Sequence, residues 1–356
     1  MKEEFKKLNI TIWLGLAHGL NDLIAGFLIA FYSATLTNVN IWTIYFTYVL
    51  IGFGGQVFAG LLVDFYKSKT RHFLVAILFI FIFCVFYIHI PPILLTILIG
   101  IASSFIHVIG GALSLQNAKN VQNRHVGIFA APGTIGLALG GLLSLQPALA
   151  TAIFAVLTLF LTLTFLFIDK SAFILQETHE KVDNQRLIKF EKHGIIMALL
   201  LLMFTFRSVL WEVGQYLFVQ DIQAITIIAG FAFFGKLLGG LASEKFTPKT
   251  YIYGTLGIAL FLFSISFKNL WLIAMGNAFL QSSIPITLQL LYQQMPEKPA
   301  TASGLGFGLT LLIAGIPFLR WSGTPYTPYL YLIGGIALVL INILLFRSKA
   351  MEKQSI

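Results

Sequence analysis

Residues 54–64 read GGQVFAGLLVD and residues 234–244 read FGKLLGGLASE, and a Lys-Thr pair follows each segment five residues later. The segments align without gaps at an offset of 180 residues, so that Gly60 corresponds to Gly240 and Asp64 to Glu244. That offset is about half of the 356 residues. The pattern predicts a chain built from two copies of one unit, in the same orientation.

The composition indicates that the solvent of these units is lipid. Hydrophobic residues make up 58% of the chain, charged residues only 10%, and the mean hydropathy is +0.88. A helix needs roughly 20 apolar residues to cross a bilayer. The sequence therefore predicts an all-α polytopic membrane protein of about twelve transmembrane helices. The expected helices are 9–33, 41–64, 72–90, 92–116, 125–145, 147–168, 194–219, 221–244, 250–267, 270–292, 300–320 and 325–346.

One long polar connection, residues 169–193, interrupts this series in the middle. It predicts an N-terminal six-helix bundle over residues 1–168, a cytoplasmic linker over 169–193 and a C-terminal six-helix bundle over 194–356. The basic N-terminus resembles the start of a signal peptide. The apolar run behind it is too long for one and carries His18 and Asp22, so we expect a retained first helix.

The basic residues are distributed asymmetrically. Of the 23 Lys and Arg residues, 19 fall at the termini, in the 169–193 segment and in alternate short loops, whereas the opposite loops and adjoining helix ends carry only Lys268 and Arg320. This bias predicts that both termini are cytoplasmic in a cell (inner) membrane. The net charge of +9 is then a topology signal, and nucleic-acid binding is not needed to explain it.

Polar side chains concentrate on every third predicted helix. Helices 3, 6, 9 and 12 carry few of them and are expected to face lipid, because a polar group in hydrocarbon is costly. Helices 1, 4, 7 and 10 carry many, as lining of a shared aqueous cavity would require. The residues we expect at a substrate and proton site on or near these helices are His18, Asn21, Asp22, His107, Arg207, Glu212, Lys236 and Gln281.

This pattern resembles the major facilitator superfamily (MFS) of transporters, in which helices 1, 4, 7 and 10 line the cavity. Residues 60–64, with the basic residues that follow, resemble that family's loop motif between helices 2 and 3. The resemblance implies a gating role for Gly60, Asp64, Gly240 and Glu244. Residues 18–22 and 100–107 resemble the fosmidomycin-resistance-like branch, except that Val108 and Ile109 stand where that branch has proline and an acid.

His18 and Asp22 lie one turn apart on one helix face. The pair is expected to form a proton site, because neighbours tune an acid held in low dielectric. The alternative is a permanent structural hydrogen bond. His107 is either a cavity ligand or proton relay, or a neutral histidine bonded to a neighbouring serine.

Arg207 and Glu212 are five residues apart on helix 7, too far around the helix to pair directly. Arg207 either binds an anionic substrate or neutralises an acid such as Asp22. Lys236 is likewise either a substrate site or the counter-ion of Glu212.

Several chemistries are not expected. The single Cys84 excludes an intrachain disulfide, there is no P-loop, and the seven histidines are too scattered in sequence to predict a metal site. We expect no cofactor. Two rival functions are a membrane-embedded enzyme acting on a lipid-like substrate through His18, Asp22 and His107, and a passive channel. The half-chain repeat disfavours the enzyme.

The sequence favours a monomeric secondary active transporter, which is not an enzyme and whose partners are a small solute, protons and the lipid bilayer. Arg207 and Lys236 favour an anionic or zwitterionic solute. The expected mechanism is proton-coupled alternating access, and the branch resemblance implies export (efflux).

Overall fold

The computed structural model describes residues 2–35, 41–85, 91–118, 122–168, 173–175, 186–266, 268–315 and 327–347. Most of the predicted linker, and Arg320, lie outside these ranges. Every regular element in them is helical, which confirms the all-α prediction.

The N-terminal helices follow the apolar segments closely. Prolines begin α5 and α7, where the missing backbone N–H costs no helical hydrogen bond. The elements are α1 (Lys2–Thr35), α2 (Ile41–Tyr48), the π-helix η1 (Val49–Gly54), α3 (Gly55–Phe65), the 3-10 turn η2 (Lys67–Lys69), α4 (Thr70–Val85), α5 (Pro92–Asn117), α6 (Arg124–Leu143) and α7 (Pro147–Phe167).

The C-terminal helices start at clear caps. The side chains of Asp221, Thr247 and Asn269 accept hydrogen bonds from the first free backbone N–H groups of α9, α10 and α11. The elements are α8 (Arg186–Tyr216), α9 (Ile222–Ala242), η5 (Ser243–Lys245), α10 (Pro248–Ile265), α11 (Leu270–Ser282), α12 (Ile284–Gln294), α13 (Pro299–Ser303), the π-helix η6 (Gly304–Leu309), α14 (Thr310–Gly315) and α15 (Thr327–Arg347). Helix α8 starts within the predicted linker.

Nine helices within the described ranges are long and apolar enough to cross a membrane. The other three predicted spans correspond to α10, to α11 with α12, and to α13 with η6 and α14. Pro285 enters the first turn of α12 and interrupts the helix at Ser283, because proline cannot continue a helical hydrogen-bond ladder. The count of twelve stays a prediction.

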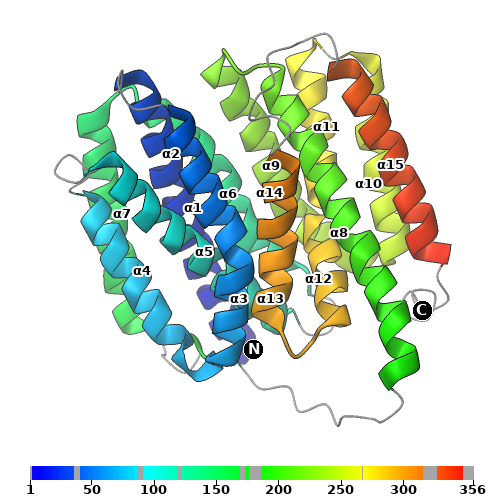
Figure 1. The fold of residues 1–356 in the computed structure, drawn as a ribbon, viewed down its shortest axis with the longest axis horizontal. Coiled ribbons are helices and arrows are strands. Elements are labelled where there is room, and N and C mark those ends of the chain that lie inside the picture. The colour runs from blue at the N-terminus through cyan, green and yellow to red at the C-terminus, as the bar shows by residue number, and fades with distance from the viewer. Residues whose placement is uncertain are drawn as a thin grey trace.

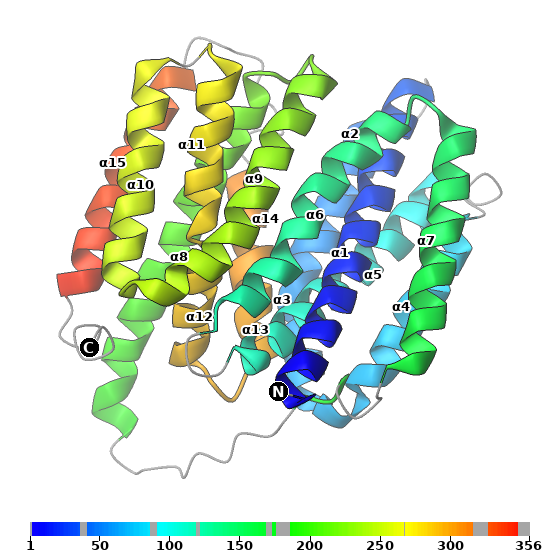
Figure 2. The same cartoon turned by 180° about the vertical axis from the view of Figure 1, so that it is seen from behind.

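Helices α1–α7 and α8–α15 form two groups that lie side by side, and α3 lies next to α13 near the N-terminus (Figures 1 and 2). Helices α4 and α7 occupy the outside of one group, and α10 and α15 the outside of the other (Figure 1). Large apolar side chains are exposed on all four helices, as expected for surfaces that face lipid. Examples are Phe79, Phe83, Phe160, Phe167, Phe261, Leu332 and Leu344.

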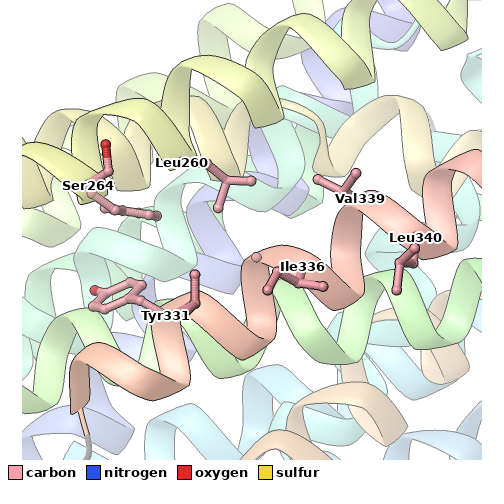
Figure 3. Close-up of a pocket in the computed structure, with 9 residues that line it drawn as sticks. Leu260, Ser264, Tyr331, Ile336, Val339 and Leu340 are labelled. Carbon is pink, nitrogen blue, oxygen red and sulfur yellow. The ribbon is translucent and has the colours of Figure 1, made fainter.

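Two apolar grooves lie away from the predicted polar site. One, of 310 Å³, runs between α10 and α15 and is lined by residues such as Leu260, Tyr331 and Ile336 (Figure 3). The other, of 670 Å³, is bordered by α9, α10 and α11. Their lining is almost wholly apolar, as on a surface covered by acyl chains.

Candidate functional site

Three titratable side chains converge where α1 meets α5. His18 Nε2 lies 3.0 Å from His107 Nε2 and 3.2 Å from Asp22 Oδ2, and His107 Nε2 lies 4.0 Å from the same oxygen. We call these three residues the His-Asp-His cluster. Both histidines are buried, with exposed fractions of 5% and 4%, whereas the Asp22 side chain is 13% exposed. The carboxylate is therefore the part of the cluster most open to solvent.

Backbone carbonyls orient both imidazoles. His18 Nδ1 lies 2.9 Å from the Phe129 carbonyl oxygen on α6, and His107 Nδ1 lies 2.8 Å from the Ser103 carbonyl oxygen one turn earlier on α5. A carbonyl oxygen only accepts hydrogen bonds, so each Nδ1 carries the hydrogen and donates it. In the neutral form of each ring, Nε2 is consequently a bare acceptor.

Close helix packing holds the cluster together. Gly133 on α6 faces it directly: a Cβ at this position would overlap the His18 ring and lie 2.6 Å from Asp22 Oδ2. The ring of Phe129 stacks on that of His18 at a centroid distance of 4.8 Å. The Asn21 side-chain amide donates to Asp22 Oδ1 at 2.9 Å. Glycine at position 133 is thus required for the cluster to form.

Lys236 approaches the cluster from the C-terminal helices. Its ammonium donates a hydrogen bond to Thr134 Oγ1 on α6 and is close enough to Asp22 and His107 to interact electrostatically. Of the two roles proposed for Lys236, that of counter-ion to Glu212 has no supporting contact among the described residues, where the acid near Lys236 is Asp22. The hydrogen bond links α9 to α6, the helix whose Phe129 and Gly133 pack against the cluster.

Arg207 and Glu212 do not join this group. Arg207 on α8 is buried, donates to Thr287 Oγ1 at 3.4 Å, and lies over the ring of Phe204. It forms no ion pair with Asp22, which corrects that alternative. Glu212 has no hydrogen bond or ion pair among the described residues, and its electrostatic neighbour there is Tyr45 on α2. Gln281 is buried on α11.

The sequence predicted no metal site from its scattered histidines, but the fold brings two of them together. The Nε2 atoms of His18 and His107 and a carboxylate oxygen of Asp22 all lie within 4.8 Å of one another, a spacing compatible with one shared cation. The Lys236 ammonium favours a proton over a divalent metal ion, because it repels the larger added charge more strongly.

The expected gating acid Asp64 binds the first turn of α13. Its Oδ1 accepts from the Ala300 backbone N–H at 3.0 Å, and its Oδ2 accepts from the Thr301 N–H and hydroxyl, both at 2.7 Å. The orphan N–H groups and the dipole of a helix N-terminus favour an anion there. Asp64 thus joins α3 to the start of the α13–η6–α14 segment.

Glu244 makes the equivalent contact with α6. Its Oε1 accepts from the Arg124 backbone N–H at 3.0 Å and from the Arg124 side-chain Nε at 3.1 Å. The offset between the two acids is 180 residues, and that between Thr301 and Arg124 is 177. Each acid therefore caps a helix that belongs to the other group.

The two glycines of the motif make reciprocal contacts with the opposite group, as the two acids do. A Cβ on Gly60 would lie 2.6 Å from the Ala300 carbonyl oxygen, and one on Gly240 would lie 3.0 Å from that of Asn123. Both glycines permit contact between backbones from opposite groups. Sequence reasoning placed helix starts at 125 and 300 but did not identify them as the partners of the two acids. The 180-residue offset does not align these two starts, because Arg124 and Thr301 are 177 residues apart.

A second missed contact joins the cluster to α13. The Ser303 hydroxyl donates to the His107 carbonyl oxygen at 3.0 Å, and the Phe307 ring lies 6.5 Å from the His107 ring. Serine is common in transmembrane helices, so the sequence offered no signal for this contact. It connects the helix that carries His107 to the segment that Asp64 caps.

The arrangement of helices is the MFS transporter fold. An MFS transporter, FucP, in its outward conformation matches with a TM-score of 0.70 over 96% of this chain and 98% of that chain, at 16% identity. A structure of a variant of the E. coli fucose:proton symporter FucP matches with a TM-score of 0.68 over 98% and 99%, at 15% identity. Likeness at this identity establishes the fold. No protein-family model and no curated protein sequence matches the chain.

Proposed function

We propose that this protein is a secondary active transporter that moves a small solute by alternating access and couples the movement to protons through the His-Asp-His cluster. The observation that carries the proposal is the meeting of three titratable groups on α1 and α5, with Lys236 facing them from α9. Buried titratable groups at the interface of two helix bundles are typical of proton relays in transporters.

The reciprocal caps support the alternating-access part. Asp64 and Glu244 each hold the N-terminus of a helix in the other group, so both contacts must break if the groups separate at this end. Breaking a few charge-assisted hydrogen bonds costs a few kcal/mol, a size that ligands and protons can overcome. Two such contacts form a gate rather than a permanent interface.

The solute that we propose is anionic or zwitterionic. Arg207 is a buried cation whose hydrogen-bond partner among the described residues is the neutral hydroxyl of Thr287. A buried guanidinium without a carboxylate is costly, and a solute carboxylate or phosphate supplies the missing charge. The proposed direction is export, from the branch resemblance, and we propose a monomer with both termini in the cytoplasm of the cell.

The test is counterflow and pH-gradient-driven transport in proteoliposomes, with solutes chosen by a thermal-shift screen on purified protein. Asp22→Asn is expected to abolish accumulation driven by a pH gradient, while solute-for-solute exchange survives. Glu212→Gln is the comparison variant, because Glu212 is another acid within a membrane span and does not contact the cluster, and accumulation should survive in it if the cluster carries the proton. Accumulation that survives in both variants together would refute coupling through either acid.

The two rival functions have distinct outcomes in the same system. The fold is one of transporters, which disfavours a membrane-embedded enzyme, and turnover of a lipid-like substrate by purified protein would restore that alternative. A passive channel predicts a flux that does not saturate and shows no counterflow.

A further inference from the structure

We propose that the coupling proton resides between the two histidines, shared by His18 Nε2 and His107 Nε2, and that Asp22 is its counter-charge and its route to water. This inference rests on the proposed proton coupling and names the atoms that perform it. It also replaces the simpler expectation that the proton is carried on Asp22 itself.

The first step is the count of hydrogens around the two rings. Each Nδ1 donates its hydrogen to a backbone carbonyl, so in the neutral rings both Nε2 atoms present lone pairs. These lone pairs face each other at 3.0 Å, which is a hydrogen-bond distance. Two acceptors at this separation repel unless a hydrogen lies between them. One added proton turns the repulsion into a charge-assisted N–H···N bond.

The second step asks whether a proton on Asp22 satisfies the same atoms. A protonated Oδ2 can donate to His18 Nε2 at 3.2 Å, but the two imidazole lone pairs remain opposed. The bond from the Asn21 amide to Oδ1 does not distinguish the two forms, because the carbonyl oxygen of a carboxylic acid also accepts, so the opposed imidazole lone pairs decide this step. With Asp22 ionised and one ring protonated as imidazolium, no two acceptor atoms in the cluster face each other without a hydrogen between them.

The third step is the charge that surrounds the cluster. Lys236 faces it from α9, and Tyr48 faces it from α2, where the phenol is within hydrogen-bond distance of Ser103 Oγ at 3.3 Å. From α6 and α13 the facing groups are the uncharged Phe129 carbonyl and Ser303 hydroxyl. With its proton the cluster is neutral, and without it the cluster carries one negative charge, which the Lys236 ammonium opposes.

This charge difference connects the proton to the two helix groups. Loss of the proton strengthens the attraction between the cluster on α1 and α5 and the ammonium on α9, and gain of the proton weakens it. The proton enters from water at Asp22, whose side chain is more exposed than either imidazole, and moves from Oδ2 to His18 Nε2. It leaves by the reverse of that path or toward the other side of the membrane. Only O–H and N–H bonds form and break, so the step needs no other reactant.

The experiment is nitrogen NMR of the full-length protein in lipid, labelled with ¹⁵N at its seven histidines. Near neutral pH we expect one imidazolium, with both nitrogens protonated, and a coupling across an N–H···N bond. The coupling across the N–H···N bond should vanish in His18→Gln and in His107→Gln, because each variant removes one of the two rings. His125→Gln is the matched control, since His125 is also buried but bonds Thr11 instead, and the imidazolium should persist there.

Lys236→Gln tests the electrostatic part. Without the ammonium the unprotonated cluster has no opposing charge, so the imidazolium should persist to higher pH, with a proton affinity raised by about tenfold or more. An unchanged pH range would refute the role of Lys236.

Neutral histidines in the wild type, with a protonated carboxylic acid at Asp22, would overturn the proposal. So would stoichiometric binding of Co²⁺ that is lost in His18→Gln and His107→Gln, because the shared cation would then be a metal ion. Transport driven by a pH gradient is measured separately, so it can test the proposed function after either result. Transport that persists without an imidazolium would therefore reject this inference and retain the proposed function, whereas transport that is absent would reject the proposed function.

Discussion

Replacing Asp64 with asparagine should open the contact between α3 and α13. The Asp64 carboxylate accepts three hydrogen bonds, of 3.0, 2.7 and 2.7 Å, from Ala300 and Thr301. Asparagine keeps one acceptor oxygen but loses the charge and the second oxygen. With that oxygen in the place of Oδ2 it can still accept both bonds from Thr301, but its NH2 group then faces the Ala300 N–H, which loses its acceptor.

The cost follows from the bonds that are lost. One charge-assisted hydrogen bond contributes about 1.5–3 kcal/mol, and a charge at a helix N-terminus about 0.3–1 kcal/mol. A combined loss of about 2–4 kcal/mol shifts the ratio of closed to open states by about 30- to 900-fold. Thr301→Val removes one of these charge-assisted bonds but keeps the carboxylate at the helix N-terminus, so it should shift the ratio by about 10- to 160-fold.

The assay is pulsed electron–electron distance measurement between spin labels at Lys69→Cys and Lys249→Cys, in a Cys84→Ala background. These lysines are exposed, lie just beyond the two gate acids, and correspond to each other in the repeat. In Asp64→Asn the distance distribution should gain a longer component. Opening at this end is the expected result because the lost contact joins the two groups there.

The matched control is Asp221→Asn. Asp221 also caps a helix N-terminus with its carboxylate, accepting from the Gln223 and Ala224 N–H groups at 3.0 Å, but every partner lies within its own helix. This variant should lose thermal stability without a change in the distance distribution. If Asp64→Asn leaves the distribution unchanged, or if Asp221→Asn alters it equally, the reasoning about the gate is refuted.

Three further predictions concern packing, topology and the repeat. Gly133→Ala should displace His18, cost about 1–3 kcal/mol of stability and abolish the imidazolium signal, whereas Gly254→Ala, which has open space around it, should do neither. Reporter fusions at Ile356 and within residues 169–193 should be active only with a cytoplasmic reporter, and an external signal from either would overturn the orientation. Gly60→Leu and Gly240→Leu should each lengthen the spin-label distances, because both side chains would meet backbone of the opposite group, and an effect confined to one would show that the contacts are not equivalent.

Composition and hydropathy were sufficient to predict the class of fold. Bilayer thickness imposes a length on each apolar segment, so the predicted spans coincide with the helices to within a few residues at most of their described ends. The same physics identified the polar helices, because a charged or amide side chain in lipid is too costly to occur without a reason. His18 and Asp22 were recognised as neighbours because one helical turn separates them.

Tertiary packing alone decided which polar residues meet. His107 lies 89 residues from His18 in the sequence, and their contact depends on the approach of α1, α5 and α6 that Gly133 permits. The same applies to Lys236. The sequence did not decide whether Asp22 or Glu212 is the acid near it, and in the fold that acid is Asp22. Local periodicity specifies the face of a helix on which a side chain lies. It contains no information about the rotation and depth of the neighbouring helix, and those two quantities set the 3.0 Å between the imidazoles.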